Sequence, residues 1–179
     1  MYCYCLYCKT EKCKYVARAM EIVFGCRAVL PTQIQHIRRK GEMLDVERSL
    51  FPGYLFLYSE QARLDILKLR AVDGVIRCLN GSPEDYSLRG NDELFAQVLF
   101  QRGGVLGKTK VYRVGQRIYL NDEVFGGVEA TIVKVDVRKG RMKVEFPFAN
   151  TRLATWVEYE VTENRETEDP AAPPTDETA

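Results

Sequence analysis

The residues best suited to chemistry in this sequence are its six cysteines, of which Cys5 and Cys8 have C-x-x-C spacing. Such a pair at the start of a helix is typical of thiol-dependent redox proteins, in which one thiol has a lowered pKa. However, residues 2–8 are rich in aromatic residues and cysteine and contain no helix breaker, which predicts a buried strand. Two residues three positions apart on a strand point to opposite faces, so this pair is poorly placed for one disulfide or one metal ion. A thiol-dependent redox protein is therefore kept as an alternative function.

Other reactive combinations are missing from the sequence. A structural zinc site needs four ligands, but no second C-x-x-C follows and the one histidine, His36, is distant in sequence. A nucleophile–base pair of the Ser/His or Cys/His type would also have to use His36. Gly103-Gly104 and Gly126-Gly127 lack the spacing and the following lysine of a phosphate-binding loop. We therefore expect no metal, no cofactor and no enzymatic activity.

The composition is that of a folded chain with an uneven charge distribution. Of the 179 residues, 46% are hydrophobic and 28% are charged, which is enough apolar surface for a core. The net charge of +1 conceals a basic stretch, residues 101–162, and an acidic one, residues 163–179. No run approaches the ~18 apolar residues of a membrane span, and the first residues lack a signal-peptide pattern. We expect a soluble, cytoplasmic protein with reduced cysteines and no membrane partner.

Hydrophobic periodicity predicts two domains. Residues 1–100 have the order β, α, β, β, β, α, β, α, which predicts an α+β domain with helices against an antiparallel sheet. Residues 101–112 contain three glycines, three basic residues and no acidic residue, which is typical of a flexible linker. Residues 113–162 carry only strand signals, at a spacing that predicts a small β-barrel. The acidic, proline-containing residues 163–179 are expected to be a disordered tail.

Three stretches, read in order, carry a family resemblance. The first is Leu6-Tyr7-Cys8-Lys9, which runs into a helix with basic residues, and the second is Leu50-Phe51-Pro52-Gly53-Tyr54-Leu55-Phe56-Leu57. The third is residues 113–118 followed by residues 124–133. The second stretch resembles the most distinctive motif of the NusG N-terminal (NGN) domain, and the third is similar to the KOW motif. The resemblance implies an NGN domain joined by a linker to a small KOW β-barrel of the Src-homology-3-like type.

Two departures from the usual KOW motif are informative. Ala130 stands where the motif typically has glycine, and Glu123-Val124 replaces the usual Gly-Pro before the phenylalanine. These departures favour a specialised paralogue of the RfaH/LoaP kind, an antiterminator of a few long operons, over the general factor of the family.

The resemblance implies a transcription elongation or antitermination factor that binds bacterial RNA polymerase and suppresses pausing or termination. In this family the NGN domain holds the clamp coiled coil of the polymerase in an apolar depression. On the predicted strand, Tyr54, Phe56 and Tyr58 share one face, and an exposed aromatic row is the kind of patch that marks a binding site. Together with Tyr7 and Phe51, they are the expected polymerase-binding residues. The alternative is that both faces of this strand belong to the core.

A second candidate surface is basic and lies around the first predicted helix. Lys14 and Arg18 are one helical turn apart and Lys9 lies just before the helix, so the three side chains could follow a phosphate backbone. In the resembled family this surface would face the non-template DNA strand of the transcription bubble. The alternative is an ordinary solvated helix face.

A third candidate surface lies at one end of the predicted barrel. Its basic residues are Lys134, Arg138, Lys139, Arg141 and Lys143. Arginine can pair with phosphate through two hydrogen bonds or stack on an RNA base. Some specialised relatives are thought to bind RNA through this barrel, so a hairpin in the nascent RNA is the preferred ligand.

Three alternatives remain for this surface. It could be a turn whose charges serve solubility. The barrel could instead recruit a ribosomal protein or a termination factor, as KOW domains of the family do elsewhere. A further alternative is an RNA or ribosome adaptor that makes no contact with polymerase.

Overall fold

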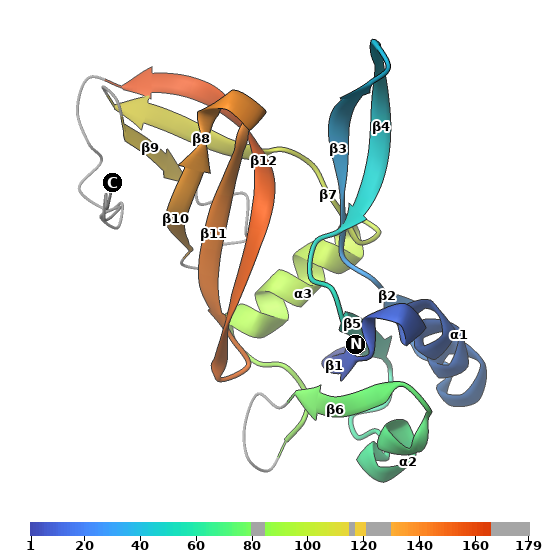
Figure 1. Ribbon diagram of the computed structural model, residues 1–179. Coiled ribbons are helices and arrows are strands. Elements are labelled where there is room, and N and C mark those ends of the chain that lie inside the picture. The colour runs from blue at the N-terminus through green and yellow to red at the C-terminus, as the bar shows by residue number, and fades with distance from the viewer. Residues whose placement is uncertain (80–84, 115–116, 121–129, 166–179) are drawn as a thin grey trace.

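The structure, a computed structural model, describes residues 1–79, 85–114, 117–120 and 130–165 (Figure 1). An α+β part formed by the first hundred residues carries a projecting hairpin, and a curled five-stranded sheet lies beside that hairpin. The predicted α+β class is therefore confirmed. None of the helices within the described ranges is both long and apolar enough to cross a membrane.

The N-terminal part is built on a four-stranded antiparallel sheet with the strand order β2-β5-β1-β6. Its strands are β1 (Tyr2–Cys8), β2 (Arg27–Val29), β5 (Tyr54–Ser59) and β6 (Val75–Leu79). A short 3-10 turn, η1 (Thr10–Lys12), leads into α1 (Cys13–Phe24), which with α2 (Ile66–Ala71) covers one face of the sheet. Val16 and Met20 of α1 pack there against Leu55 and Leu57 of β5, because alternate residues of a strand point to the same face.

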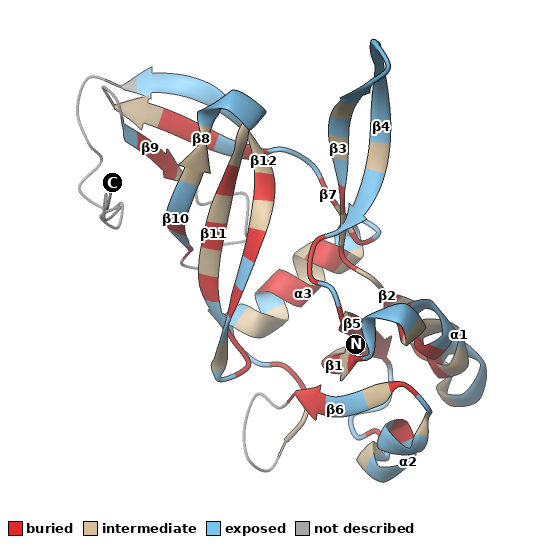
Figure 2. Cartoon of the chain, viewed as in Figure 1, coloured by how far each residue is buried: buried red, intermediate tan, exposed pale blue. Residues whose placement is uncertain are grey.

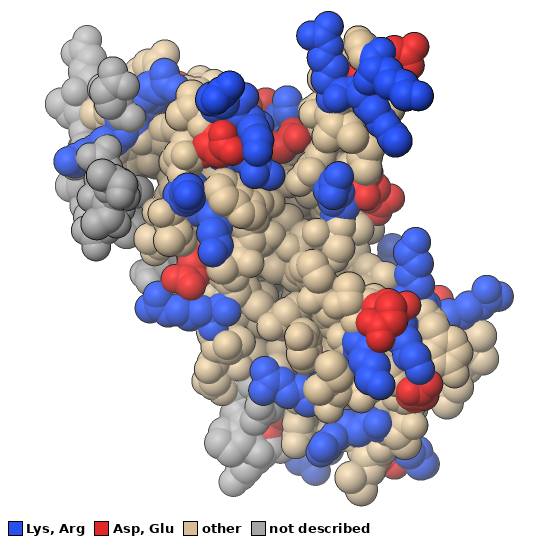
Figure 3. Space-filling view, in the orientation of Figure 1, with Lys and Arg blue, Asp and Glu red and all other residues tan. Residues whose placement is uncertain are grey.

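A two-stranded hairpin, here called the arm, projects from this part. It consists of β3 (Thr32–Arg39) and β4 (Glu42–Ser49), and the short β7 (Val105–Leu106) pairs in parallel with the base of β3. Most of the arm is exposed (Figure 2). Lysine and arginine side chains gather over its free end (Figure 3).

The second part is a curled sheet with the strand order β10-β11-β12-β8-β9. Its elements are β8 (Thr109–Val114), β9 (Arg117–Leu120), β10 (Thr131–Asp136), η3 (Val137–Lys139), β11 (Arg141–Phe148) and β12 (Thr151–Arg165). The long β12 pairs antiparallel with β11 and then parallel with β8, and the sheet curls into a small barrel-like shape, called the barrel below (Figure 1). Alternate residues of β11 point inward, as the period of a strand requires: Met142, Val144, Phe146 and Phe148 are buried.

The expected flexible linker at residues 101–112 is wrong. Gln101 ends α3 (Asn91–Gln101), and β7 and most of β8 occupy the same stretch. The glycines have a local function: the Gly104 N–H donates to the Leu99 carbonyl at 2.8 Å, and Thr32 N–H donates to the Gly104 carbonyl at 2.9 Å. They therefore end α3 and turn the chain onto the arm, and no spacer separates the two parts.

The expected boundaries at the C-terminal side also differ from the structure. The barrel begins at β8, four residues before the predicted start, and β12 continues to Arg165, past the predicted start of the tail at residue 163. Most of the KOW-like stretch 124–133 lies outside the described residues, as do Glu123-Val124 and residues 166–179 of the predicted tail.

The two parts share one hydrophobic core. Helix α3 lies between the N-terminal sheet and the barrel (Figure 1). Phe95 of α3 has its ring centroid 6.0 Å from those of Phe51 and Phe56 on the sheet side, and 5.2 Å from that of Phe146 in the barrel. The Phe148 ring lies 5.6 Å from Phe56 and 6.1 Å from Phe95. These five phenylalanines are called the junction below.

Gly53, in the turn before β5, has a backbone conformation and a close backbone neighbour that a side chain would disturb. Its φ is +91°, and a Cβ there would lie 2.9 Å from the Cys8 carbonyl oxygen. We expect Gly53→Ala to lower the free energy of unfolding by about 2–4 kcal/mol, because left-handed strain and a steric clash add together. The matched control is Gly41→Ala, where φ is +90° and nothing lies within 4 Å of the added Cβ. It should cost about 1–2 kcal/mol in urea unfolding, and equal losses for both variants would contradict the account.

Candidate functional site

The predicted aromatic row lies at the centre of the molecule. Tyr54, Phe56 and Tyr58 do share a face of β5, as their spacing predicts, and this face is the one opposite α1 and α2. The prediction that this row is exposed is wrong for most of it. Phe51, Phe56 and Tyr58 are between 0% and 3% exposed.

Two layers cover this face. The inner layer is α3: the Tyr58 hydroxyl donates to the Ala96 carbonyl at 2.6 Å, and the Tyr58 ring lies 4.7 Å from Phe100. The outer layer is the barrel, whose Phe146 ring is 5.7 Å from Phe51. The α3 helix and β11 each present an apolar stripe, and burying both stripes on the same aromatic face removes all three surfaces from water.

An exposed rim remains at one side of the covered face. Tyr7 and Tyr54 are half-buried, their ring centroids are 5.1 Å apart, and the Arg77 guanidinium lies over the Tyr7 ring. Burial raises the pKa of the Tyr54 phenol, so it stays protonated and available as a hydrogen-bond donor at neutral pH. Of the five predicted polymerase-binding residues, these two are accessible with the barrel in place.

Among the described residues, at least four hydrogen bonds join the barrel to the N-terminal part. The Thr155 hydroxyl donates to the Leu50 carbonyl at 2.6 Å, and the Ala149 N–H donates to Asp92 Oδ2 at 2.9 Å. The other two run between β12 and the arm, from Glu158 N–H to Gln33 Oε1 and from His36 N–H to Glu158 Oε1. The strands of the barrel and those of the N-terminal part belong to different sheets. These hydrogen bonds, each of which uses a side chain, therefore join the two parts without backbone pairing between their strands.

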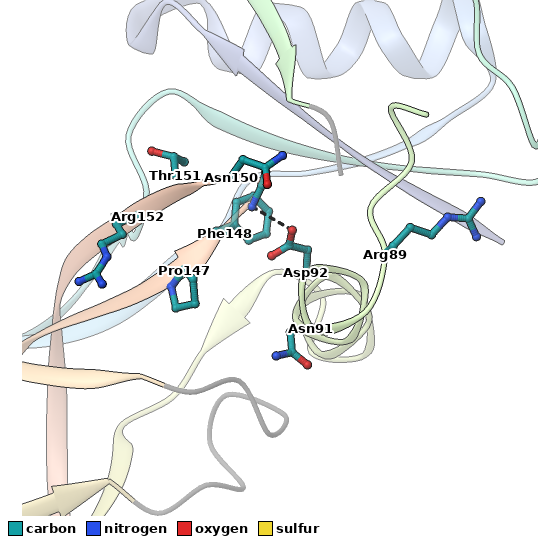
Figure 4. A pocket seen from close by; sticks show the side chains of 9 residues that line it. Arg89, Asn91, Asp92, Pro147, Phe148, Asn150, Thr151 and Arg152 are labelled. Carbon is teal, nitrogen blue, oxygen red and sulfur yellow. Dashed lines mark hydrogen bonds between the residues drawn. The ribbon is translucent and has the colours of Figure 1, made fainter. Parts of the chain in front are cut away.

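Asp92 lines a shallow cavity at this contact. The cavity, about 530 Å³ in volume, lies between the start of α3 and the β11–β12 turn, and Asp92 points toward that turn (Figure 4). Burial raises the pKa of the Asp92 carboxyl, and the Ala149 N–H opposes this shift. The carboxylate thus carries a desolvation cost in this arrangement, which weakens the contact that it makes.

The cations of the first helix form an exposed surface, as predicted from their spacing. Lys9, Lys14 and Arg18 are exposed on α1 and on the residue before η1, whereas Lys12 is ion-paired with Asp73. Sequence reasoning did not single out Tyr15, which is 60% exposed and follows Lys14 directly. An aromatic ring beside two cations adds a stacking surface for a nucleic-acid base.

The barrel cations lie around an aromatic residue that the sequence-based prediction missed. Lys134, Lys143 and Trp156 are cross-strand neighbours on β10, β11 and β12, and the guanidinium of Arg141 lies 4.6 Å from the centre of the Trp156 ring system. Asp136 pairs with Arg141 at 3.5 Å and with Lys139 at 3.9 Å. The outward direction of Trp156 follows from its neighbours, since Thr155 and Val157 point inward.

The thiol environment is unlike that of a redox centre. Cys5 belongs to the core on the α3 side of β1 and Cys8 to the core on the α1 side, so the pair is split between two faces as expected. All six cysteines are free and buried. Burial raises the pKa of Cys8 to about 12 and that of Cys5 well above its usual range, which is opposite to the lowered pKa of a redox thiol. Within the described ranges, no group of three or more His, Cys, Asp or Glu residues is placed to hold a metal ion.

Known proteins resemble this chain in sequence. Residues 1–94 match the family model described as NusG, transcription termination factor nusG. The transcription termination/antitermination proteins NusG of Chlamydia pneumoniae and of Chlamydia trachomatis are each 28% identical to it over 117 residues, 65% of this chain. The match spans 64% of the length of these relatives.

The fold has a counterpart among solved structures. The structure described as "Domain interaction in Thermotoga maritima NusG" aligns with a TM-score of 0.54, covering 88% of this chain and 93% of that one. At 15% sequence identity, this similarity concerns the fold.

The buried thiols give a test of the redox alternative. We expect none of the six cysteines to react with a disulfide reagent at pH 8 within minutes, because burial raises the pKa of each thiol and keeps it protonated. All six should react after unfolding in guanidinium. Rapid modification of Cys5 or Cys8 in the folded protein would contradict this description.

Proposed function

The chain belongs to the NusG family, and from this premise we propose that it is a transcription elongation or antitermination factor that binds bacterial RNA polymerase. The proposed contact is the clamp coiled coil, held against Tyr7, Phe51, Tyr54 and Phe56, while Tyr58 stays beneath α3 and supports this face from below. The observation that carries the proposal is the aromatic face of β5, against which the barrel packs. Bound there, the factor would hold the clamp closed and suppress pausing or termination.

The cover can leave without unfolding either part. The barrel has its own ladder of strands and its own inward-facing residues, and the N-terminal sheet keeps α3 on its aromatic face when the barrel departs. Departure would expose the junction rings Phe51, Phe56 and Phe95, an apolar patch of the kind that a coiled coil can bind. The barrel and the clamp therefore compete for one surface.

This competition sets the apparent affinity for polymerase. If only a small fraction of molecules is open, the observed dissociation constant exceeds the intrinsic one by the reciprocal of that fraction. A factor built in this way would stay inactive until a partner draws the barrel away. The departure from the KOW motif at Ala130, which is buried in the barrel, supports a specialised paralogue over the general factor.

Substitution of Phe148, which contacts Phe56 and Phe95, tests whether the barrel blocks the clamp-binding surface. We expect Phe148→Ala in the full chain to tighten binding of a clamp coiled-coil fragment about 10-fold or more, because losing roughly 1.4 kcal/mol of closing energy raises the open fraction tenfold. Adding Tyr54→Ala to this variant should weaken binding again. Isothermal titration calorimetry measures both changes.

The matched control is Phe24→Ala, which removes a partly buried ring of α1 from the opposite core. It should leave the affinity unchanged while lowering stability. The proposal would be contradicted if Phe148→Ala left the affinity unchanged, or if Phe24→Ala tightened binding to the same degree.

We further infer that the barrel binds RNA through its outer face. The supporting observation is the stacking of Arg141 on Trp156, flanked by Lys134 and Lys143, because a cation-lined aromatic surface suits both phosphates and bases. Arg138 and Lys139 extend the positive charge at η3. The proposed ligand is a hairpin in the nascent transcript, and a ribosomal protein or a termination factor is the alternative partner. The exposed Lys9, Lys14 and Arg18 would face the non-template DNA strand.

Trp156 is the one tryptophan of the chain, so the tryptophan fluorescence of the protein reports on the outer face of the barrel. We expect an RNA stem-loop to change the tryptophan fluorescence on binding, because the stacked Arg141 must rearrange or be overlaid. Lys143→Gln should lower the slope of log affinity against log salt by about 1, the contribution of one phosphate contact. Lys110→Gln, an exposed lysine of β8, is the control and should leave the slope unchanged. Binding seen by mobility shift without any change in fluorescence would contradict the site.

A further inference from the structure

The two strands of the arm differ sharply in charge. Strand β3 and the turn after it carry Arg38, Arg39 and Lys40 and no acidic residue, whereas β4 carries Glu42, Asp45 and Glu47 beside one arginine. The three consecutive cations are exposed, and none of the ion pairs among the described residues uses them. Arg39 is the cross-strand neighbour of Glu42, whereas Arg38 lies opposite Met43, so the end of β3 keeps an excess of positive charge.

The basic strand is the one that faces the barrel. β3 pairs with β4 on one side, and beyond Gln33 its other edge has no strand partner in the described part of the chain. That edge meets β12 at Glu158, whose backbone N–H donates to Gln33 Oε1 and whose carboxylate accepts from the His36 N–H at 3.1 Å. Arg38 and Arg39 lie two and three residues further toward the free end of the arm, so they rise about 7–10 Å beyond this contact.

The barrel carries cations on the same side of this contact. Glu158 is the cross-strand neighbour of Arg141, and the next residue, Tyr159, donates its N–H to the Gly140 carbonyl just after η3. Arg138 and Lys139 of η3 therefore lie beyond the Glu158 contact, as the free end of the arm does. The space-filling view shows basic side chains on both lobes, with a hollow between them (Figure 3).

We propose that the arm and the η3 end of the barrel form the two walls of one site for the sugar–phosphate backbone of an RNA stem. This deepens the proposed RNA contact of the barrel and rests on it. The arm, residues 32–49, contains no Phe, Tyr or Trp, so it has no ring on which an unpaired base could stack. Cations without aromatic residues contact phosphates, and double-helical RNA is recognised mainly through its backbone and shape. The barrel wall supplies Trp156 and Arg141 for the adjoining loop.

The site has acidic groups near its floor, and one of them, Asp45 of β4, pairs with the His36 ring. Glu158 accepts the His36 N–H, and Asp136 is shared by Lys139 and Arg141, so each carboxylate is engaged with the protein. Both walls are in place when the barrel covers the junction. An RNA stem held between them therefore binds the closed arrangement better than the open one.

The test compares two sets of three substitutions in the full chain. Arg38→Gln, Arg39→Gln and Lys40→Gln together remove the cations of the arm. Arg63→Gln, Lys68→Gln and Arg70→Gln remove the same charge from the exposed region around α2. The probes are an RNA stem-loop, a single-stranded RNA of the same length and a DNA duplex of the stem sequence.

We expect the arm variant to bind the RNA stem-loop about 10-fold or more weakly, with the slope of log affinity against log salt smaller by about 2–3, and the control variant to match the wild type. Single-stranded RNA should be little affected, because its proposed contacts lie on the barrel. Phe148→Ala should weaken stem binding as well, since it releases one wall from the other.

The possible outcomes distinguish a failure of the two-walled site from a failure of the proposed RNA contact of the barrel. If the wild type binds the stem-loop through Lys143 and the arm variant binds equally well, the two-walled site is overturned while the barrel contact stands. If the DNA duplex binds as tightly as the RNA stem and loses as much in the arm variant, the assignment to RNA is overturned. If the wild type binds no RNA, both proposals fail. Circular dichroism of the arm variant confirms that it is folded.

Discussion

Five phenylalanine rings at the junction hold the two parts of this chain in one arrangement. Phe95 is central, because its ring contacts the N-terminal part through Phe51 and Phe56 and the barrel through Phe146 and Phe148. All five are at most 3% exposed, and burying a phenylalanine side chain stabilises by about 1.5–3 kcal/mol. Hydrogen bonds around the junction fix the orientation of the barrel relative to the N-terminal part. One of them is accepted by Asp92, a carboxyl whose pKa is raised by burial.

The two proposed activities depend on opposite states of this junction. Polymerase would bind the aromatic face when the barrel leaves it, whereas the walls between the arm and η3 face each other when the barrel is in place. The short connection between the parts reinforces this coupling, because residues 101–112 fold into the end of α3, β7 and β8. An effector that binds one state shifts the population of the other, with no separate signalling element.

Local patterns in the sequence predicted most elements, and what they missed depends on contacts between distant residues. The period of two along β5 placed Tyr54, Phe56 and Tyr58 on one face, and the opposed sides of Cys5 and Cys8 followed from the same rule. Whether that aromatic face meets solvent depends on Phe146 and Phe148, some ninety residues away, which no local period encodes. The glycines at 103 and 104 resembled a linker because composition does not distinguish a flexible glycine from one that ends a helix. Trp156 could have been found from its inward-facing neighbours, and the charge difference between β3 and β4 could have been read once their pairing was known.

The measurement that tests this account most directly is the distance between the arm and the barrel in solution. Spin labels attached through Met43→Cys and Arg138→Cys would report it by pulsed electron paramagnetic resonance, since the six natural cysteines are buried and the two positions are exposed. We expect one narrow distance distribution for the free protein and a broad one once a clamp coiled-coil fragment is bound. A broad distribution in the free protein, or a narrow one that persists with the fragment bound, would contradict it.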